Sequence, residues 1–216
     1  MKYFILFILF LFPSLSICGQ TINKQAEKGK TNVRLVDFTR HHFIKKWKNT
    51  ANNVVYQRTA TANNKYFERL ASNPQRKLPL VPRKDLTGDD YLVDSAYYCK
   101  TIFSTKKYTL NIYKSGSKYK DKMGDEMFAP VDYLVFVTMD SQQRIVDYLV
   151  CYYNVHRLYE SAERFFYMNN DHHITLINFY VDEIDTSFKG IQKYLINNQG
   201  KFVLLNKKNG HKRVTK

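Results

Sequence analysis

Hydrophobic and polar residues alternate in short blocks through the C-terminal half of the chain. From residue 91 onward, runs rich in Tyr, Val, Ile, Phe and Thr are separated by short polar segments. β-Branched and aromatic residues favour extended backbone, and such runs, bounded by Asn, Asp, Gly or Ser, are typical of strands. The pattern predicts strands at residues 91–103, 107–113, 131–139, 145–153, 164–168, 174–182, 191–196 and 201–205.

Three of the polar connections have the same form. They are MDSQQRI (139–145), MNNDHHI (168–174) and INNQGKF (196–202), and each places Asp or Asn directly after an apolar residue. Asn, Asp and Gly tolerate the left-handed backbone that hairpin turns need. These connections are therefore predicted to be hairpins, and the strands that they join to be antiparallel neighbours.

The pentapeptide Val-Asp-Tyr-Leu-Val occurs twice, at 131–135 and at 146–150. A chain that folds back near Gln142 forms three cross-strand pairs: Tyr133 with Cys151, Val135 with Leu149 and Phe136 with Tyr148. Aromatic and branched pairs across antiparallel strands stabilise a sheet. We interpret the repeat as cross-strand pairing and not as a ligand motif.

Neither face of the strands at 131–139 and 145–153 is polar. An antiparallel sheet with one wet face should alternate apolar and polar residues. This sheet is therefore predicted to be covered on one face by N-terminal helices, with sheet curvature, a ligand or a partner accounting for the other. The candidate ligand-binding residues are the aromatic ones on these two strands: Tyr133, Phe136, Tyr148 and Tyr152.

The segment before the strands has helical periodicity. Apolar residues between 33 and 47 fall on one side of a helix, and a second helical segment spans 53–70. Residues 72–90 hold three of the five prolines and show no period, so we expect a linker there. The predicted fold is α+β: an N-terminal helical segment at 20–71, packed on a curved antiparallel β-meander of seven to eight strands at 91–205. A basic tail follows at 206–216.

The first residues predict export. A single lysine precedes an unbroken apolar run at 3–12, which is shorter than the roughly 20 residues that cross a bilayer, and a proline follows. These features are typical of a signal peptide at 1–19. Cleavage after Gly19 competes with lipidation of Cys18, because residues 15–18 resemble a bacterial lipobox. We expect a periplasmic or extracellular protein, either free or lipid-anchored to a bacterial membrane.

Two cysteines remain after the signal segment, Cys99 and Cys151. An even pair in an oxidising compartment is consistent with one disulfide bond, provided that the geometry allows it. The alternative is two buried free thiols that pack as small apolar groups.

The chain is strongly basic, with a formal net charge of +15 over 216 residues. Such a charge attracts anionic partners, although scattered lysines also keep a protein soluble. For an exported protein we expect an anionic glycan, a lipid head group or an acidic protein as partner. Nucleic acid is not expected, and a membrane only through a lipid anchor.

Few residues are spaced for catalysis. His172 and His173 are the candidate metal ligands, but adjacent residues of a strand point to opposite faces and the carboxylates at 182–185 lie a strand's length away. A thiol site would need Cys99 or Cys151 with His156. No motif for a cofactor is present, and none is predicted. The sequence favours a non-enzymatic binding or interaction protein that uses its aromatic sheet face or basic loops; the alternatives are a secreted hydrolase with a metal or thiol site and a polyanion-binding protein.

Overall fold

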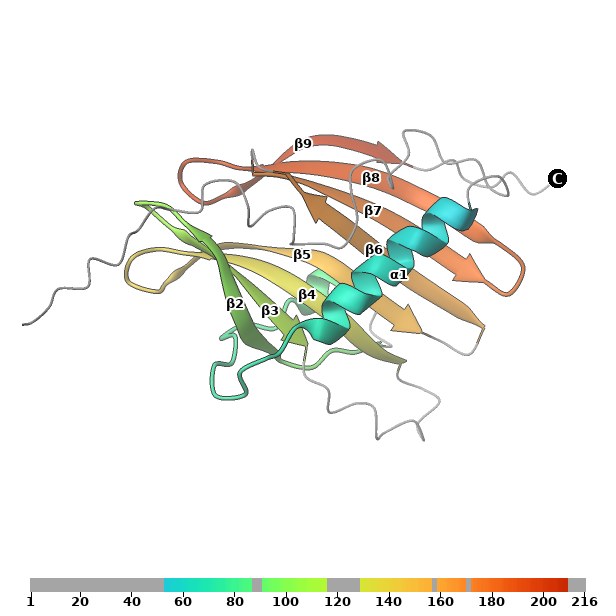
Figure 1. The fold of residues 1–216 in the computed structure, drawn as a ribbon, viewed down its shortest axis with the longest axis horizontal. Helices are drawn as coiled ribbons and strands as arrows, with labels where there is room; N and C mark the ends of the chain where they lie inside the picture. Colours follow the sequence, from blue (N-terminus) through green and yellow to red (C-terminus); the bar gives the residue numbers. More distant parts are fainter. Residues whose placement is uncertain (1–52, 87–90, 116–128, 157–158, 170–171, 210–216) are drawn as a thin grey trace, which may run out of the picture.

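One large antiparallel sheet and one helix dominate the fold (Figure 1). The computed structural model describes residues 53–86, 91–115, 129–156, 159–169 and 172–209. Eight antiparallel strands follow one another in chain order across the sheet, so the sheet is a meander. They are β2 (Ala96–Ser104), β3 (Thr109–Ser115), β4 (Ala129–Met139), β5 (Ile145–His156), β6 (Glu160–Met168), β7 (His173–Asp182), β8 (Thr186–Ile196) and β9 (Phe202–Asn209). A two-residue strand, β1 (Tyr91–Leu92), pairs in parallel with β4.

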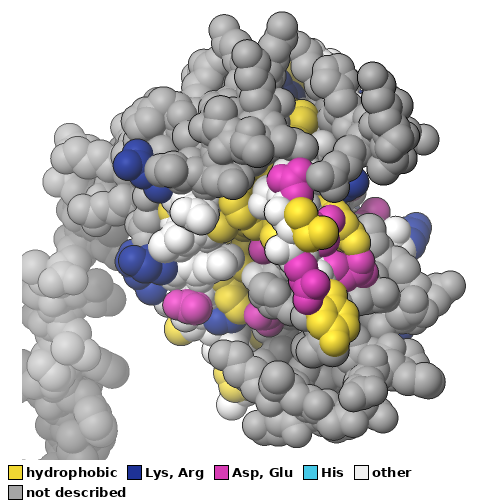
Figure 2. Space-filling view, turned by 90° about the vertical axis from the view of Figure 1, so that its right-hand side faces the viewer, with side chains coloured by type: hydrophobic (Ala, Val, Ile, Leu, Met, Phe, Trp, Pro, Cys, Tyr) yellow, Lys and Arg dark blue, Asp and Glu magenta, His cyan; other side chains and the backbone are white. Residues whose placement is uncertain are grey.

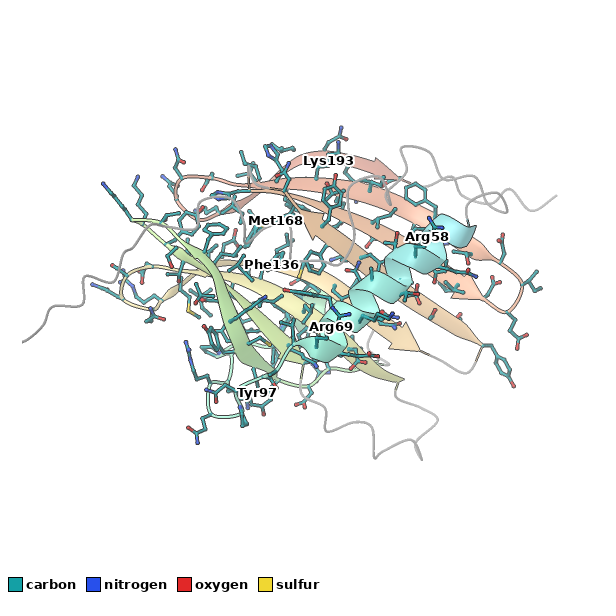
Figure 3. The ribbon with its side chains drawn as sticks, in the orientation of Figure 1. Arg58, Arg69, Tyr97, Phe136, Met168 and Lys193 are labelled. Atoms are coloured by element: carbon teal, nitrogen blue, oxygen red, sulfur yellow. The ribbon has the colours of Figure 1, made fainter. Side chains whose placement is uncertain are left out.

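Helix α1 (Asn53–Arg69) lies across one face of the sheet (Figure 1). Its buried side chains recur at helical spacing and form one stripe: Thr59, Ala62, Asn63, Tyr66 and Phe67. Arg58 and Arg69 are exposed along the helix (Figure 3). The antiparallel sheet preceded by a helix is thereby confirmed, and the helix predicted within 53–70 is present. The helix predicted between 33 and 47, the signal segment at 1–19 and Cys18 lie outside the described residues.

Within the described part of the chain, no helix is both long and apolar enough to cross a membrane.

The three connections of shared form are hairpins with one common geometry. In each, the first residue (Asp140, Asn169 or Asn197) donates its backbone N–H to the carbonyl four residues on, and accepts the N–H of the residue three on. The fourth residue is left-handed, with φ of 62° at Gln143, 59° at His172 and 82° at Gly200. The first side chain also accepts the N–H four residues on in all three turns. The shared Asp or Asn therefore closes each turn.

The predicted β4–β5 pairing is correct at the turn and wrong along the strands. Met139 pairs with Ile145, as a fold-back at Gln142 requires, but Val135 pairs with Val150, and Tyr133 with Tyr153. Two register shifts in β5 cause the difference, because each inserts one extra residue opposite β4. Residue-type patterns carry no signal for such bulges.

Each face of the central strands packs against a different part of the chain. On the α1 side, Leu134, Phe136 and Tyr152 join the helix in one core cluster, and Phe136 lies in the crowded middle of the molecule (Figure 3). On the opposite side, Tyr133 and Val135 join a second cluster. That cluster includes Leu78, Leu86 and Val93, which flank or belong to the predicted linker at 72–90. The linker segment therefore covers the second face of β2–β5.

The same segment protects the β2 edge of the sheet. Asn73 donates its backbone N–H to Tyr98, Tyr98 donates to Arg76, and Leu78 donates to Ala96. An uncovered edge would offer unpaired N–H and C=O groups to other strands. At Ala96 and Tyr98 the chain satisfies those groups itself.

Strands β5 and β6 pair over only part of their length. Their register runs from Tyr153–Arg164 to His156–Ser161, whereas β6 and β7 pair along all of β6. Where they separate, side chains satisfy the backbone. The Asn63 side-chain oxygen of α1 accepts the Phe166 N–H at 3.3 Å, and the Arg164 guanidinium donates to the Val150 carbonyl at 2.9 Å. One side chain from each face therefore fills the opening.

Candidate functional site

The aromatic residues proposed from sequence as ligand contacts lie mainly in the core. Tyr133 and Phe136 are fully buried and Tyr152 is 2% exposed, while Tyr148 is partly buried. The Tyr152 hydroxyl donates to the Asn64 side chain of α1 at 2.8 Å. Packing against α1 on one face, and against Leu78, Leu86 and Val93 on the other, accounts for the apolar character of both faces of β4 and β5. These strands therefore offer little aromatic surface to a ligand.

Cys99 and Cys151 are free thiols, so the prediction of a disulfide bond between them is wrong. Cys99 lies on β2 and Cys151 on β5, and β3 and β4 lie between them. Three strand spacings of about 4.8 Å separate the two by about 14 Å, far beyond the 7 Å or so that a disulfide spans between Cα atoms. Both residues are the extra ones at bulges.

Neither thiol is activated. Burial raises the pKa of Cys99 to about 11, although Lys114 and Lys100 oppose the effect. Burial also raises the pKa of the fully buried Cys151 well above its ordinary value. A nucleophilic cysteine needs a lowered pKa. The His156 side chain lies outside the described ones.

The two candidate metal ligands lie at the β6–β7 hairpin. The His172 ring stacks on Phe103, with 4.2 Å between the ring centroids, and His173 is the first residue of β7. Asp182 is at the other end of that strand. Among the described residues, no three His, Cys, Asp or Glu side chains are grouped to hold a metal ion.

A groove of about 340 Å³ crosses the outer part of the sheet from β5 to β9. It lies on the face away from α1, since its β6 residues Ala162 and Arg164 alternate with Glu163 and Phe165, which contact the helix through Tyr56. The linker cluster covers β2–β5 on this face and includes Ala162 at its margin. The groove is lined by Tyr153, Ala162, Arg164, Asn178, Phe179, Tyr180, Lys189, Gly190, Ile191, Gln192, Lys207 and Asn209.

Arg164 is fixed at the floor of the groove. Its Nε donates to the Asn178 side-chain oxygen at 2.8 Å, a second nitrogen donates to the Val150 carbonyl, and the guanidinium lies 4.8 Å from the centroid of the Tyr153 ring. An arginine held by three contacts keeps its charge in one place and loses little entropy when it binds a ligand.

A bulge places Lys189 at the groove. Asn178 of β7 pairs with Gly190 and the next residue, Phe179, pairs with Phe188, so Lys189 is the extra residue. Gly190 has a φ of 142°, which residues with a Cβ rarely adopt. The Lys189 ammonium lies 5.0 Å from the centroid of the Tyr180 ring, in the range of a cation–π contact. Bulges of this kind redirect a side chain.

The groove lining is basic and amide-rich. Arg164, Lys189 and Lys207 contribute positive charge, three carboxamides contribute donors and acceptors, and no carboxylate belongs to the described lining. The acid that a contact places beside this lining is Glu160, whose carboxylate accepts the hydroxyl proton of Tyr180. The arrangement can bind an anionic group through cations that the Tyr153 and Tyr180 rings hold in place.

One end of the molecule is acidic, in contrast to the basic groove. It is formed by the first residues of β6 and by the β7–β8 turn. Figure 2 shows Asp and Glu side chains gathered there around hydrophobic ones. The acids are Glu160, Asp182, Glu183 and Asp185, and Tyr159 and Ile184 are 64% and 89% exposed. This acidic end adjoins the groove, because Tyr180 lines the groove and donates its hydroxyl proton to Glu160.

Sequence reasoning missed the groove residues. Two signals were available. Arg164 places a charge at the start of the otherwise apolar run RFFYM, and Gly190 lies inside a strand, where a glycine often marks a bulge. Neither shows that residues from five strands meet at one place, because that depends on register.

No family model matches the chain, and neither a curated protein nor a solved structure matches it.

Proposed function

We propose that this is an exported, non-enzymatic binding protein whose ligand carries anionic groups and occupies the groove between β5 and β9. The observation that carries the proposal is the convergence of Arg164, Lys189 and Lys207 in one concave site without a described carboxylate. The sequence predicted a binding surface on the aromatic residues of β4 and β5. The proposed binding surface is instead the groove between β5 and β9.

The groove suits recognition better than nonspecific attraction. Arg164 is held in place by Asn178, Val150 and Tyr153, and Lys189 is positioned by a bulge. Charged donors on a pre-organised surface give stronger and more directional hydrogen bonds than mobile lysines. Carboxylate, sulfate and phosphate groups all fit this chemistry.

The proposal includes export and a bent sheet. The signal-like segment at 1–19 supports a periplasmic or extracellular location, with or without lipid on Cys18. Contacts between distant hairpins support curvature: Thr138 donates its hydroxyl proton to the Gly200 carbonyl at 2.6 Å, and the Phe202 N–H donates to Asp147 at 2.9 Å. A sheet that bends near β5 and β6 would bring these segments together with its concave side toward α1, because Thr138 shares the face of Phe136.

The hydrolase alternative gains no support from the described residues. The thiols have raised pKa values, and His172 is stacked on Phe103. A nucleophile or a metal-bound water would need a lowered pKa or a cluster of ligands.

Heparin chromatography with matched variants tests the proposal. The double variant Lys189→Gln/Lys207→Gln removes two groove charges, and Lys65→Gln/Lys193→Gln removes two exposed charges outside the groove lining. We expect the groove variant to elute at clearly lower salt than the wild-type chain, because a localised anion site loses two of its contacts. The control variant should elute close to wild type. Equal shifts for the two variants would show that retention comes from diffuse charge and would contradict the proposal.

A further inference from the structure

Each edge of the sheet is covered over part of its length by the described residues. Residues 73–78 cover the β2 edge at Ala96 and Tyr98 with backbone hydrogen bonds. Strand β9 pairs with β8 and has no second partner strand among the described residues. Three consecutive apolar residues of β9 are exposed: Val203 by 40%, Leu204 by 47% and Leu205 by 51%. A strand of this kind is a template for another extended chain.

The hydrogen bond of Phe202 indicates which backbone N–H groups of β9 point away from β8. Its N–H donates to the Asp147 carboxylate of β5, away from β8. In extended backbone the N–H groups of residues two apart point the same way, so the Leu204 N–H also points away from β8. Among the described residues, the β9 edge is therefore occupied at Phe202 and unpaired from Leu204 onward, with Leu205 as the extra residue at a bulge opposite β8.

The open edge adjoins the groove. Lys207 and Asn209 of β9 line the groove, and Lys189, Gly190 and Gln192 line it from β8. We propose, on the basis of the proposed function, that the ligand is an extended acidic segment of another protein. This segment adds a strand to β9 and places a carboxylate side chain in the groove. Backbone pairing would supply affinity, and the groove would select alternate acidic side chains.

Charge complementarity favours this occupant over a second copy. An edge-to-edge dimer would bring together two chains of net charge +15, with Lys201 and Lys207 along each edge. Like charges placed opposite each other on paired strands are destabilising. An acidic segment reverses the sign of each of these contacts.

The test uses a fluorescent ten-residue peptide that alternates Glu and Val, with two derivatives that carry N-methyl groups on every Glu or on every Val. Only one edge of an added strand pairs with β9, and each set of N–H groups lies on one edge. We expect one derivative to bind at least tenfold more weakly than the parent and the other to bind nearly as well. Equal binding of the two derivatives would overturn strand addition.

Two protein variants complete the test. Leu204→Pro removes an outward N–H, which an edge strand tolerates, and Leu204→Asp keeps the backbone but repels an acidic peptide. We expect both to lose peptide binding at least tenfold while retention on heparin is kept. If Lys189→Gln/Lys207→Gln weakens heparin retention but the peptide does not bind, the inference fails and the proposed function stands.

Other occupants would give different results. Sedimentation of a wild-type dimer that Leu204→Pro converts to a monomer would identify a second copy as the occupant and overturn the inference. Binding to phosphatidylglycerol vesicles or heparin tetrasaccharide with no binding to the peptide would also overturn it.

Discussion

Left-handed residues in the hairpin turns give the sharpest predictions at the scale of single residues. Gln143 adopts a φ of 62° at an exposed position, where glycine would carry no steric cost. We expect Gln143→Gly to raise the free energy of unfolding by about 0.5–1 kcal/mol, since the relief of strain outweighs the added freedom of the unfolded chain. The midpoint of urea unfolding measures it. A lower midpoint would show that the turn is not strained at Gln143.

Gly200 provides the opposite case. Its φ is 82°, and a Cβ there would lie 3.0 Å from Cγ of Tyr108. Gly200→Ala should therefore lower the free energy of unfolding by about 1–3 kcal/mol, through both backbone strain and crowding. An unchanged urea midpoint would contradict the hairpin geometry.

Asn63 is predicted to stabilise the opening between β5 and β6. Its side chain is fully buried and accepts the Phe166 N–H. Asn63→Ala leaves that donor unsatisfied, and we expect a loss of about 1–3 kcal/mol in the free energy of unfolding. The exposed neighbour Lys65 is the control, and Lys65→Ala should change the free energy little. Equal effects of the two substitutions would indicate that the contact is unimportant.

The thiols should react slowly and as groups outside any disulfide, since Cys99 is partly buried and Cys151 is fully buried. Because burial raises the pKa of Cys99 to about 11, little thiolate forms at pH 8, and alkylation of Cys99 should accelerate as the pH approaches 11. Cys151 should be alkylated only after unfolding. Peptide mapping by mass spectrometry separates both from Cys18. A Cys99–Cys151 cross-linked peptide would contradict the sheet order.

At the scale of elements, the linker segment is predicted to act as part of the core. Leu78 is 1% exposed and packs on the second face of the sheet, whereas Val81 is 41% exposed. Leu78→Ala should cost about 2–5 kcal/mol of unfolding free energy, as truncation of a buried leucine does. Val81→Ala should cost well under 1 kcal/mol. Similar costs for both would mean that the segment is detached from the sheet in solution.

Strands and turns could be predicted from the sequence because their signals are local. The runs of aromatic and branched residues correspond to strands, although the one predicted at 91–103 is divided into β1 and β2, and Asp140, Asn169 and Asn197 marked the hairpins. The pairing of residues across neighbouring strands was predicted less well. Two bulges on β5 shift its register by one residue each, and a bulge depends on contacts across the sheet that a single strand does not encode.

The candidate site could not be predicted from the sequence either, because it also depends on the register between strands. Arg164 and Asn178 are neighbours because β6 and β7 pair in one register, and Lys189 is aimed at the groove by the bulge before Gly190. The apolar faces of β4 and β5 suggested a ligand there. On the face away from α1 their cover proved to be Leu78, Leu86 and Val93, in or beside a stretch whose prolines and lack of period gave no sign of packing.

At the scale of the whole molecule, a basic groove and an acidic end lie side by side, joined by the hydrogen bond between Tyr180 and Glu160. The groove collects Arg164, Lys189 and Lys207, while the β7–β8 turn and the β6 start collect acids (Figure 2). Neighbouring regions of opposite charge orient a ligand of one sign and steer its approach. Association with an anionic ligand should therefore slow steeply as ionic strength rises, while dissociation changes less.

The most direct measurement is an NMR titration of the ¹⁵N-labelled chain with the acidic Glu-Val peptide and, separately, with heparin tetrasaccharide. The groove account predicts that the backbone amides of Arg164, Asn178 and Gly190 shift with either anion, and that amides of α1 do not. Shifts confined to the lysine-rich segments at 43–50 and 118–123, with the groove amides unmoved by both anions, would contradict it.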